Sequence, residues 1–166
     1  PAVRKKIARL IGGGAFSILG LRVNHVVEAL SEHLGLPHEK ALILARQVYI
    51  TFFNNSLEMA SVPYLSAEQI KNRLVPVGLE HLREAHAKGR GIVAISGHYG
   101  LWELLPSWLF LNGFPITTVV RRQSNRYADQ WMEWMRNAHG AKTTDSGFGL
   151  REILRTLKNG HLIGLM

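Results

Sequence analysis

The sequence predicts an α/β fold, in which a mostly parallel sheet is flanked by helices and preceded by a helical cap. From Val75 onward, short apolar runs alternate with segments of helical periodicity, which is the pattern of βαβ units. Before that point apolar residues recur every three to four positions. The chain has 166 residues, 46% of them hydrophobic, which is enough for one domain with a substantial core. We therefore expect a single domain over residues 1–166, with the cap at 1–74 and the α/β part at 75–166.

The cap is predicted from two amphipathic segments. Residues 24–35 space their valines and leucines at three to four positions and stop at Gly35, and residues 37–60 begin with a proline and carry a long apolar stripe. Residues 4–22 combine cations with apolar side chains around three glycines. Such a segment is typical either of a membrane-interface helix or of an ordinary amphipathic helix with a solvated basic face.

The α/β part is predicted to alternate strands and helices. The expected strands lie near residues 74–78 and at 91–97, 115–122, 141–145 and 161–166. The expected helices span residues 79–89, 101–113, 125–140 and 149–160. The uncharged run from Leu104 to Val120 contains Pro106 and Pro115, so it favours helix, turn and strand over a membrane span. The last strand ends at Met166 without a closing helix, and we expect the chain to be a fragment, incomplete at its C-terminus.

Charge and cysteine content limit the function classes. Lysine and arginine number 20 against 12 aspartates and glutamates, and the resulting charge of +8 favours an anionic partner such as nucleic acid, phospholipid headgroups or an acidic carrier protein. The absence of cysteine excludes disulfides and thiolate metal sites. The cations are spread over several segments and no RNA-binding motif is present, which disfavours nucleic acid.

A histidine and a glutamate follow the apolar run at the start of "GIVAISGHYGLWELL", residues 91–105. Ligands of open α/β sheets collect at the carboxyl ends of the strands, and His98 lies at that edge. Residues five apart in a continuous helix differ by about 140° around its axis. His98 and Glu103 therefore converge only if the histidine precedes the helix, and Gly97 and Gly100 are the residues that would let the backbone turn there.

A neutral imidazole oriented by a carboxylate is a general base near neutral pH. The Gly-x-Ser-x-Gly pattern of a nucleophile elbow is absent around Ser96, so the base would act on a substrate hydroxyl rather than on a protein nucleophile. The alternative interpretation of His98 is a structural histidine that its neighbours satisfy.

The same residues resemble a known family. Residues 91–105 are similar to the catalytic motif of the bacterial lipid A biosynthesis acyltransferases, the late lauroyl/myristoyl transferases of the lysophospholipid acyltransferase superfamily, in which a strand runs into Gly-His-x-Gly-x-Trp-Glu. Further similar segments are residues 75–91, 119–129, 136–142 and 149–166. Leu101 stands where the family commonly has asparagine, and Arg122 where it has proline. The resemblance covers most of residues 75–166 and extends more loosely into the cap.

The resemblance implies an acyltransferase that moves a fatty acyl chain from acyl carrier protein to a hydroxyl of a lipid A precursor, in lipopolysaccharide biosynthesis. It implies that His98 removes the hydroxyl proton, that Glu103 orients the imidazole, and that backbone N–H groups between Gly97 and Gly100 bind the oxyanion. Neither a metal nor an organic cofactor is implied. The implied location is the cytoplasmic face of the bacterial inner membrane, with the protein bound peripherally to an anionic surface.

Three arginines are candidates for substrate binding by the same resemblance. Arg121 matches the family arginine and would bind a phosphate or the glucosamine headgroup through its bidentate guanidinium. Arg122 would assist it or lie in a solvated basic loop. Arg136 matches a later family arginine, with an ion pair on a helix flank as the alternative.

Two rival functions remain open at this point. The chain could be an acyltransferase of the same superfamily that acts on another lysophospholipid or glycolipid. It could also be a non-catalytic basic module that binds a membrane or nucleic acid.

Overall fold

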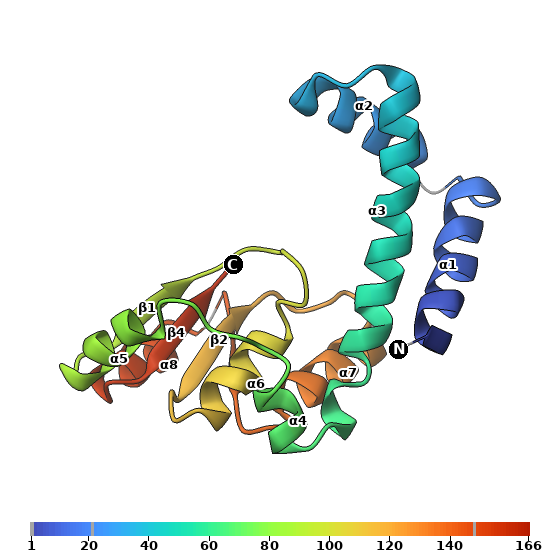
Figure 1. Cartoon of the computed structure of the whole chain (residues 1–166). Helices are drawn as coiled ribbons and strands as arrows, with labels where there is room; N and C mark the ends of the chain where they lie inside the picture. The colour runs from blue at the N-terminus through green and yellow to red at the C-terminus, as the bar shows by residue number, and fades with distance from the viewer. Residues whose placement is uncertain (1, 21, 148) are drawn as a thin grey trace. The chain divides into compact units, whose positions relative to one another are not determined.

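The computed structural model describes residues 2–20, 22–147 and 149–166, and the chain separates into two compact units between Ala60 and Ser61. The first unit consists of helices (Figure 1), namely α1 (Ala2–Ser17), α2 (Val23–Leu34) and α3 (His38–Met59). In the described part of the chain no helix is both long and apolar enough to cross a membrane. The division of one domain into a cap and an α/β part at residue 74 stays a prediction.

Small residues bring α1 and α3 together. Ala8, Gly12 and Ala15 are buried at spacings of three to four residues along α1. A Cβ atom on Gly12 would lie 2.8 Å from the Cα of Ile50 in α3, so the two helix backbones are in contact there. Arg4 adds an ion pair across the same helices, with its Nη2 2.8 Å from the Oε2 of Glu58. The contact between α1 and α3 is therefore a close approach of two helix backbones, which their small side chains allow.

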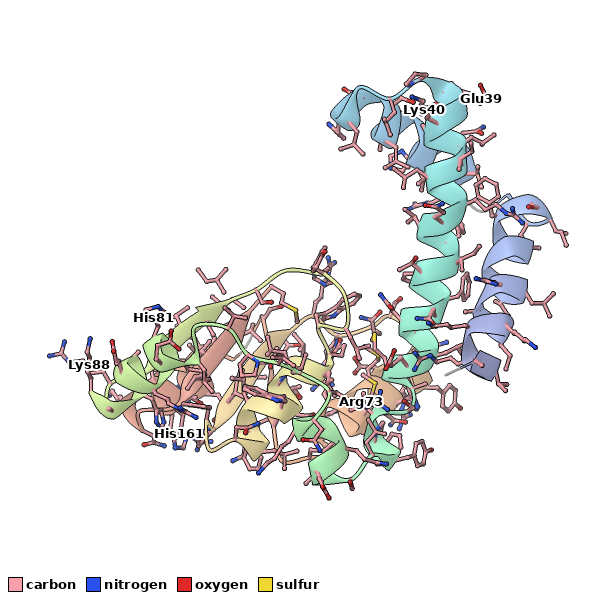
Figure 2. All side chains as sticks on the ribbon, in the orientation of Figure 1. Glu39, Lys40, Arg73, His81, Lys88 and His161 are labelled. Carbon is pink, nitrogen blue, oxygen red and sulfur yellow. The ribbon has the colours of Figure 1, made fainter. Side chains whose placement is uncertain are left out.

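The ends of α2 and α3 follow from capping chemistry. Gly35 ends α2 with φ at 62°, a left-handed conformation that glycine adopts without strain, as the sequence predicted. Pro37 precedes the first residue of α3, and Glu39 in the first turn places negative charge near the N-terminal end of the helix dipole. Glu39 and the neighbouring Lys40 are both exposed to solvent (Figure 2).

The second unit is an α/β sandwich around a four-stranded parallel sheet, which confirms the predicted fold class. The sheet has the order β1-β4-β2-β3. Its strands are β1 (Ile92–Ile95), β2 (Ile116–Val120), β3 (Lys142–Asp145) and β4 (Leu162–Leu165). Its helical elements are η1 (Val62–Tyr64), α4 (Ala67–Lys71), α5 (Leu79–Ala87), α6 (Leu104–Leu111), α7 (Arg126–Asn137) and α8 (Leu150–Lys158). All four predicted strands from residue 91 onward are present.

Helices α6 and α8 lie on opposite faces of the sheet, which two adjacent threonines of β2 demonstrate. Successive strand side chains point to opposite faces. Thr117 contacts Thr156 of α8, with 3.5 Å between the two hydroxyl oxygens. Thr118 lies beside Leu105 and Leu109 of α6. We call these the α8 face and the α6 face, and the main apolar core is on the α6 face.

The core on the α6 face joins the sheet to several helices. Its fully buried members include Leu104 of α6, Leu162 of β4 and Ile70 of α4. The indole of Trp108 is buried among them and donates a hydrogen bond from Nε1 to the carbonyl of Lys71 at 3.2 Å. Burial of apolar surface contributes about 25 cal/mol per Å², so this cluster is the main source of stability in the unit.

The strand expected at residues 74–78 is wrong. This stretch is irregular between α4 and α5, and the side chains of Val75 and Val77 are 89% and 98% exposed. Pro76 has no N–H group to donate to a neighbouring strand. Val75 and Val77 therefore have the alternation of a strand, but no strand of the described sheet pairs with them.

Candidate active site

His98 lies at the carboxyl end of β1, at the centre of a tight turn. Ser96 extends the pairing of β1 with β4 by donating its N–H to the carbonyl of Leu165 at 2.9 Å. The N–H of Tyr99 then bonds the carbonyl of Gly97 at 2.8 Å, which closes a three-residue γ-turn around His98. Gly100 follows with φ at 60°. The turn reverses the chain immediately after the sheet and leaves the imidazole exposed to solvent.

The imidazole of His98 lies against Trp102, with ring centroids 5.2 Å apart and planes tilted by 56°. The indole ring limits the positions that the histidine ring can take on its side of the turn. Of the two predicted hinge glycines, Gly100 has a left-handed conformation and Gly97 does not. Gly97 instead has open space around its missing Cβ.

Glu103 is buried at the start of α6 and forms an ion pair with Arg136, from the last turn of α7. The Nε of Arg136 donates to Oε2 of Glu103 at 2.8 Å, and Nη2 donates to Oε1 at 2.5 Å. The two side chains are 3% and 14% exposed, so this is a two-pronged pair inside the protein. Among the described residues no hydrogen bond joins Glu103 to His98. The ion pair anticipated for Arg136 is present, but it is buried between two helices and does not lie on a helix flank.

Arg122 and Arg121 follow β2 and differ in their partners. Arg122 contacts two carboxylates, with Nη1 3.0 Å from Oδ2 of Asp129 and Nε 3.5 Å from Oδ2 of Asp145. The N–H of Gln123 donates to Asp129 at 2.8 Å. This hydrogen bond, and to a smaller extent the nearby Arg122, lower the pKa of Asp129 below its usual value. Arg121 is exposed, and within the described ranges it has neither a hydrogen-bond nor an ion-pair partner.

A small apolar hollow of about 40 Å³ lies on the α6 face, between α6 and the strands β1, β2 and β4. Trp102, which contacts His98, forms part of its wall. The hydroxyl of Thr118 also borders it and is buried, without a hydrogen-bond partner in the structure. The remaining lining residues are Ala94, Ser96, Leu105, Pro106, Leu109, Ile116, Gly164, Leu165 and Met166.

A second hollow, also of about 40 Å³, lies between α7 and the carboxyl ends of β2 and β3, and is polar. Arg136 borders it, so the buried ion pair reaches both this hollow and the start of α6. The other lining residues are Val120, Arg122, Asp129, Glu133, Thr143, Thr144 and Asp145. In the described chain no group of three or more histidine, aspartate and glutamate side chains could bind a metal ion.

This fold agrees with a comparison of the sequence with known families. The family described as bacterial lipid A biosynthesis acyltransferase matches residues 36–166. The match covers most of the chain, and the chain belongs to this family of acyltransferases in lipid A biosynthesis. A search of curated proteins returned no match.

The structure adds two site features that sequence reasoning missed. The pairing of Glu103 with Arg136 joins residues 33 positions apart, and neither helix carries a local signal for it. The buried hydroxyl of Thr118 was also missed, although two threonines within an apolar strand are a signal that one of them faces a core. The assignment of His98, Glu103, Gly97, Gly100 and the three arginines to catalysis or substrate binding stays a prediction.

We predict that breaking the buried ion pair destabilises the protein strongly. Arg136→Met leaves the Glu103 carboxylate buried without its partner, which costs about 3–5 kcal/mol in similar cases. The double variant with Glu103→Leu should recover much of that loss, because no uncompensated charge remains. Urea unfolding followed by tryptophan fluorescence measures all four corners of this cycle.

The matched control for that cycle is Arg155→Met. Arg155 forms an ion pair with Glu152 on the surface of α8 and is 70% exposed, so its loss should change the unfolding free energy by less than about 1 kcal/mol. Equal effects of Arg136→Met and Arg155→Met would contradict the structural role of the buried pair.

We further predict that Thr118→Val stabilises the protein. A buried hydroxyl without a partner costs about 1–3 kcal/mol, and valine has the same shape without the hydroxyl. Thr117→Val is the control, since it removes the partner of Thr156 on the other face and should be neutral or destabilising. Thermal unfolding of both variants checks this, and a lower melting temperature for Thr118→Val would show that an unseen group satisfies its hydroxyl.

Proposed function

We propose that this protein transfers a fatty acyl chain from acyl carrier protein to a hydroxyl of a lipid A precursor, with His98 as the general base. The observation that carries the proposal is the placement of an exposed imidazole, at the carboxyl end of a parallel strand, next to an apolar hollow. An apolar hollow beside the base can take the first carbons of an acyl chain, and a hydroxyl acceptor requires an accessible base.

In this mechanism His98 takes the proton of the acceptor hydroxyl as the oxygen attacks the thioester carbonyl. The tetrahedral intermediate collapses with cleavage of the carbon–sulfur bond, and the imidazolium returns the proton to the departing thiolate. The N–H groups of Gly97 and His98 are the candidates for the oxyanion, because in the described structure neither has a hydrogen-bond partner, whereas that of Tyr99 is bonded to Gly97.

Glu103 has a supporting role in the proposal. A carboxylate has about four lone-pair sites, and Arg136 uses one on each oxygen, so capacity remains to accept an N–H from His98. Catalytic hydrogen bonds of this kind are often made only when substrate is bound. Arg136 therefore acts here as a positioning residue for the carboxylate and not as a direct substrate contact.

Arg121 is the proposed contact for the acceptor's anionic or sugar group. It is exposed at the carboxyl edge of the sheet, and its guanidinium is not engaged by any carboxylate of the described residues. Arg122 is paired with Asp129 and Asp145, so an acceptor would have to compete with both carboxylates. The first carbons of the fatty acyl chain are assigned to the apolar hollow beside Trp102.

We also propose that the protein binds peripherally to the cytoplasmic face of the bacterial inner membrane through α1. Val3 and Leu10 of this helix are 70% and 78% exposed, and Lys5, Lys6 and Arg9 are exposed beside them. A helix that exposes both apolar and cationic side chains is suited to an anionic lipid surface.

Replacing His98 with alanine should lower turnover by about 10²- to 10⁴-fold with little change in acceptor binding, because only the base is removed. Arg121→Ala should instead raise KM, and the rise should be smaller for acceptors without phosphate. Turnover is measured on purified protein with acyl carrier protein as donor and a hydroxylated lipid A precursor as acceptor. Near wild-type turnover of folded His98→Ala would exclude this mechanism.

Membrane binding should depend on charge and salt. Each Lys or Arg near an anionic bilayer contributes about 1 kcal/mol, and Lys5→Glu with Lys6→Glu should therefore weaken sedimentation with phosphatidylglycerol vesicles strongly. Binding should also fall steeply between low and physiological salt. Salt-independent binding, or equal binding to uncharged vesicles, would contradict the proposal for α1.

A further inference from the structure

The α8 face of the sheet carries exposed apolar side chains that neither the core nor the proposed reaction explains. In β1, Val93 and Ile95 point to this face and are 51% and 83% exposed. On α8, Leu150 and Leu154 are 67% and 50% exposed. On the same face Ile163 and Thr117 are buried, so the exposure is confined to the side of α8 where β1 lies.

Helix geometry shows that the exposed leucines face β1. A Cβ atom on Gly91, just before β1, would lie 2.5 Å from the Cα of Leu157, so this flank of α8 touches the start of β1. Residues of a helix are about 100° apart around its axis, which places Leu150 within about 20° of Leu157 and Leu154 within about 60°. The leucines and the β1 side chains therefore lie on the same side of α8 and together form an exposed apolar surface, which we call the α8–β1 surface.

Cations lie on α8 along the outer side of the α8–β1 surface. Arg151, Arg155 and Lys158 follow each other at spacings of four and three residues, which places them in one stripe next to the leucines. All three are exposed. Arg155 is paired with Glu152, whereas Arg151 and Lys158 have no ion-pair partner among the described residues.

The α8–β1 surface extends to the proposed catalytic site. Helix α8 follows β3, so its first residue, Leu150, lies at the carboxyl edge of the sheet, and its last residue, Lys158, lies toward the amino edge, shortly before β4 begins. Strand β1 leads directly into the turn around His98. A partner on this surface would therefore bring a flexible tethered group to the imidazole from the α8 face.

We propose that the α8–β1 surface, formed by Val93, Ile95, Leu150 and Leu154 with Arg151 and Lys158 beside them, is the docking surface for the acidic carrier protein that delivers the acyl thioester. The inference rests on the proposed function for the identity of the donor. An amphipathic acidic helix fits this surface, because its apolar side chains would cover the exposed leucines and β1 side chains while its carboxylates meet the stripe of cations. The net charge of +8 strengthens the attraction at a distance.

The test measures binding first, because binding needs no turnover. The charge-reversal variant is Arg151→Glu with Lys158→Glu, and the apolar-surface variant, which removes one exposed leucine, is Leu154→Ser. The matched control is Lys71→Glu with Arg83→Glu, which makes the same charge change at exposed positions of α4 and α5. Titration calorimetry with purified acyl carrier protein, at low and at physiological salt, gives the dissociation constants, and thermal melts confirm that each variant is folded.

We expect the charge-reversal variant to raise the dissociation constant about tenfold or more and to reduce its salt dependence, with the control within about twofold of wild type. The apolar-surface variant should weaken binding of acyl carrier protein without changing the salt dependence of that binding. Equal weakening by the control, unchanged binding in the α8 variants, or no binding by wild type would overturn the proposal. The proposal would also be overturned if the α8 variants kept carrier binding but lost binding to anionic vesicles or lost self-association in sedimentation.

Turnover then separates the docking surface from the reaction. The KM for acyl carrier protein should rise in the α8 variants, whereas the KM for the same acyl chain on free pantetheine should not change, because the small donor lacks the protein contact. If wild type binds the carrier through α8 but transfers from neither donor, the proposed function fails and the docking surface stands. If transfer from carrier is unaffected by the α8 variants, the docking surface fails and the proposed function stands.

Discussion

The buried ion pair between Glu103 and Arg136 is the interaction on which the arrangement of the site depends. Its two residues belong to the start of α6 and the last turn of α7, so it fixes the helix that follows the His98 turn against the helix that precedes β3. Removing two charges from water costs several kcal/mol for each ion, and only good geometry and close contact repay that cost. Two parallel hydrogen bonds supply this geometry. The pair therefore contributes more to selecting one arrangement of α6 and α7 than to the net free energy of folding.

The alternation of side chains along β2 divides the site into environments of different chemistry. One side of the strand meets the apolar hollow beside α6, and the opposite side packs on α8. At the carboxyl end of β2 the chain enters a polar region where Arg122 is paired with both Asp129 and Asp145. An apolar and a polar environment thus lie within a few residues of the same strand, which suits the proposed transfer between amphipathic substrates.

Local sequence patterns predicted most elements but not their long-range relations. The strands from residue 91 onward and the helices of the first unit followed from periodicity, turn residues and helix ends, all of which act over a few positions. Strand order did not follow, because it depends on how helices pack after the strands form. The false strand at residues 74–78 shows the same limit, since exposed valines around Pro76 have the alternation of a strand but no neighbour. The partner of Glu103 could not be read from the sequence either, because 33 residues separate it from Arg136 and only tertiary packing joins them.

The position of β4 in the sheet has a consequence for the order of folding. β4 is the last described strand in the sequence, yet it lies between β1 and β2 and pairs with both. During synthesis β1 and β2 therefore emerge with no shared neighbour, and their edges stay open until residues 162–165 have left the ribosome. The turn that carries His98 is bonded to the sheet through Leu165, so the histidine takes its place only after β4 has joined the sheet. Parallel pairing across such long separations is slow, which makes the nascent chain dependent on protection from aggregation until that strand inserts.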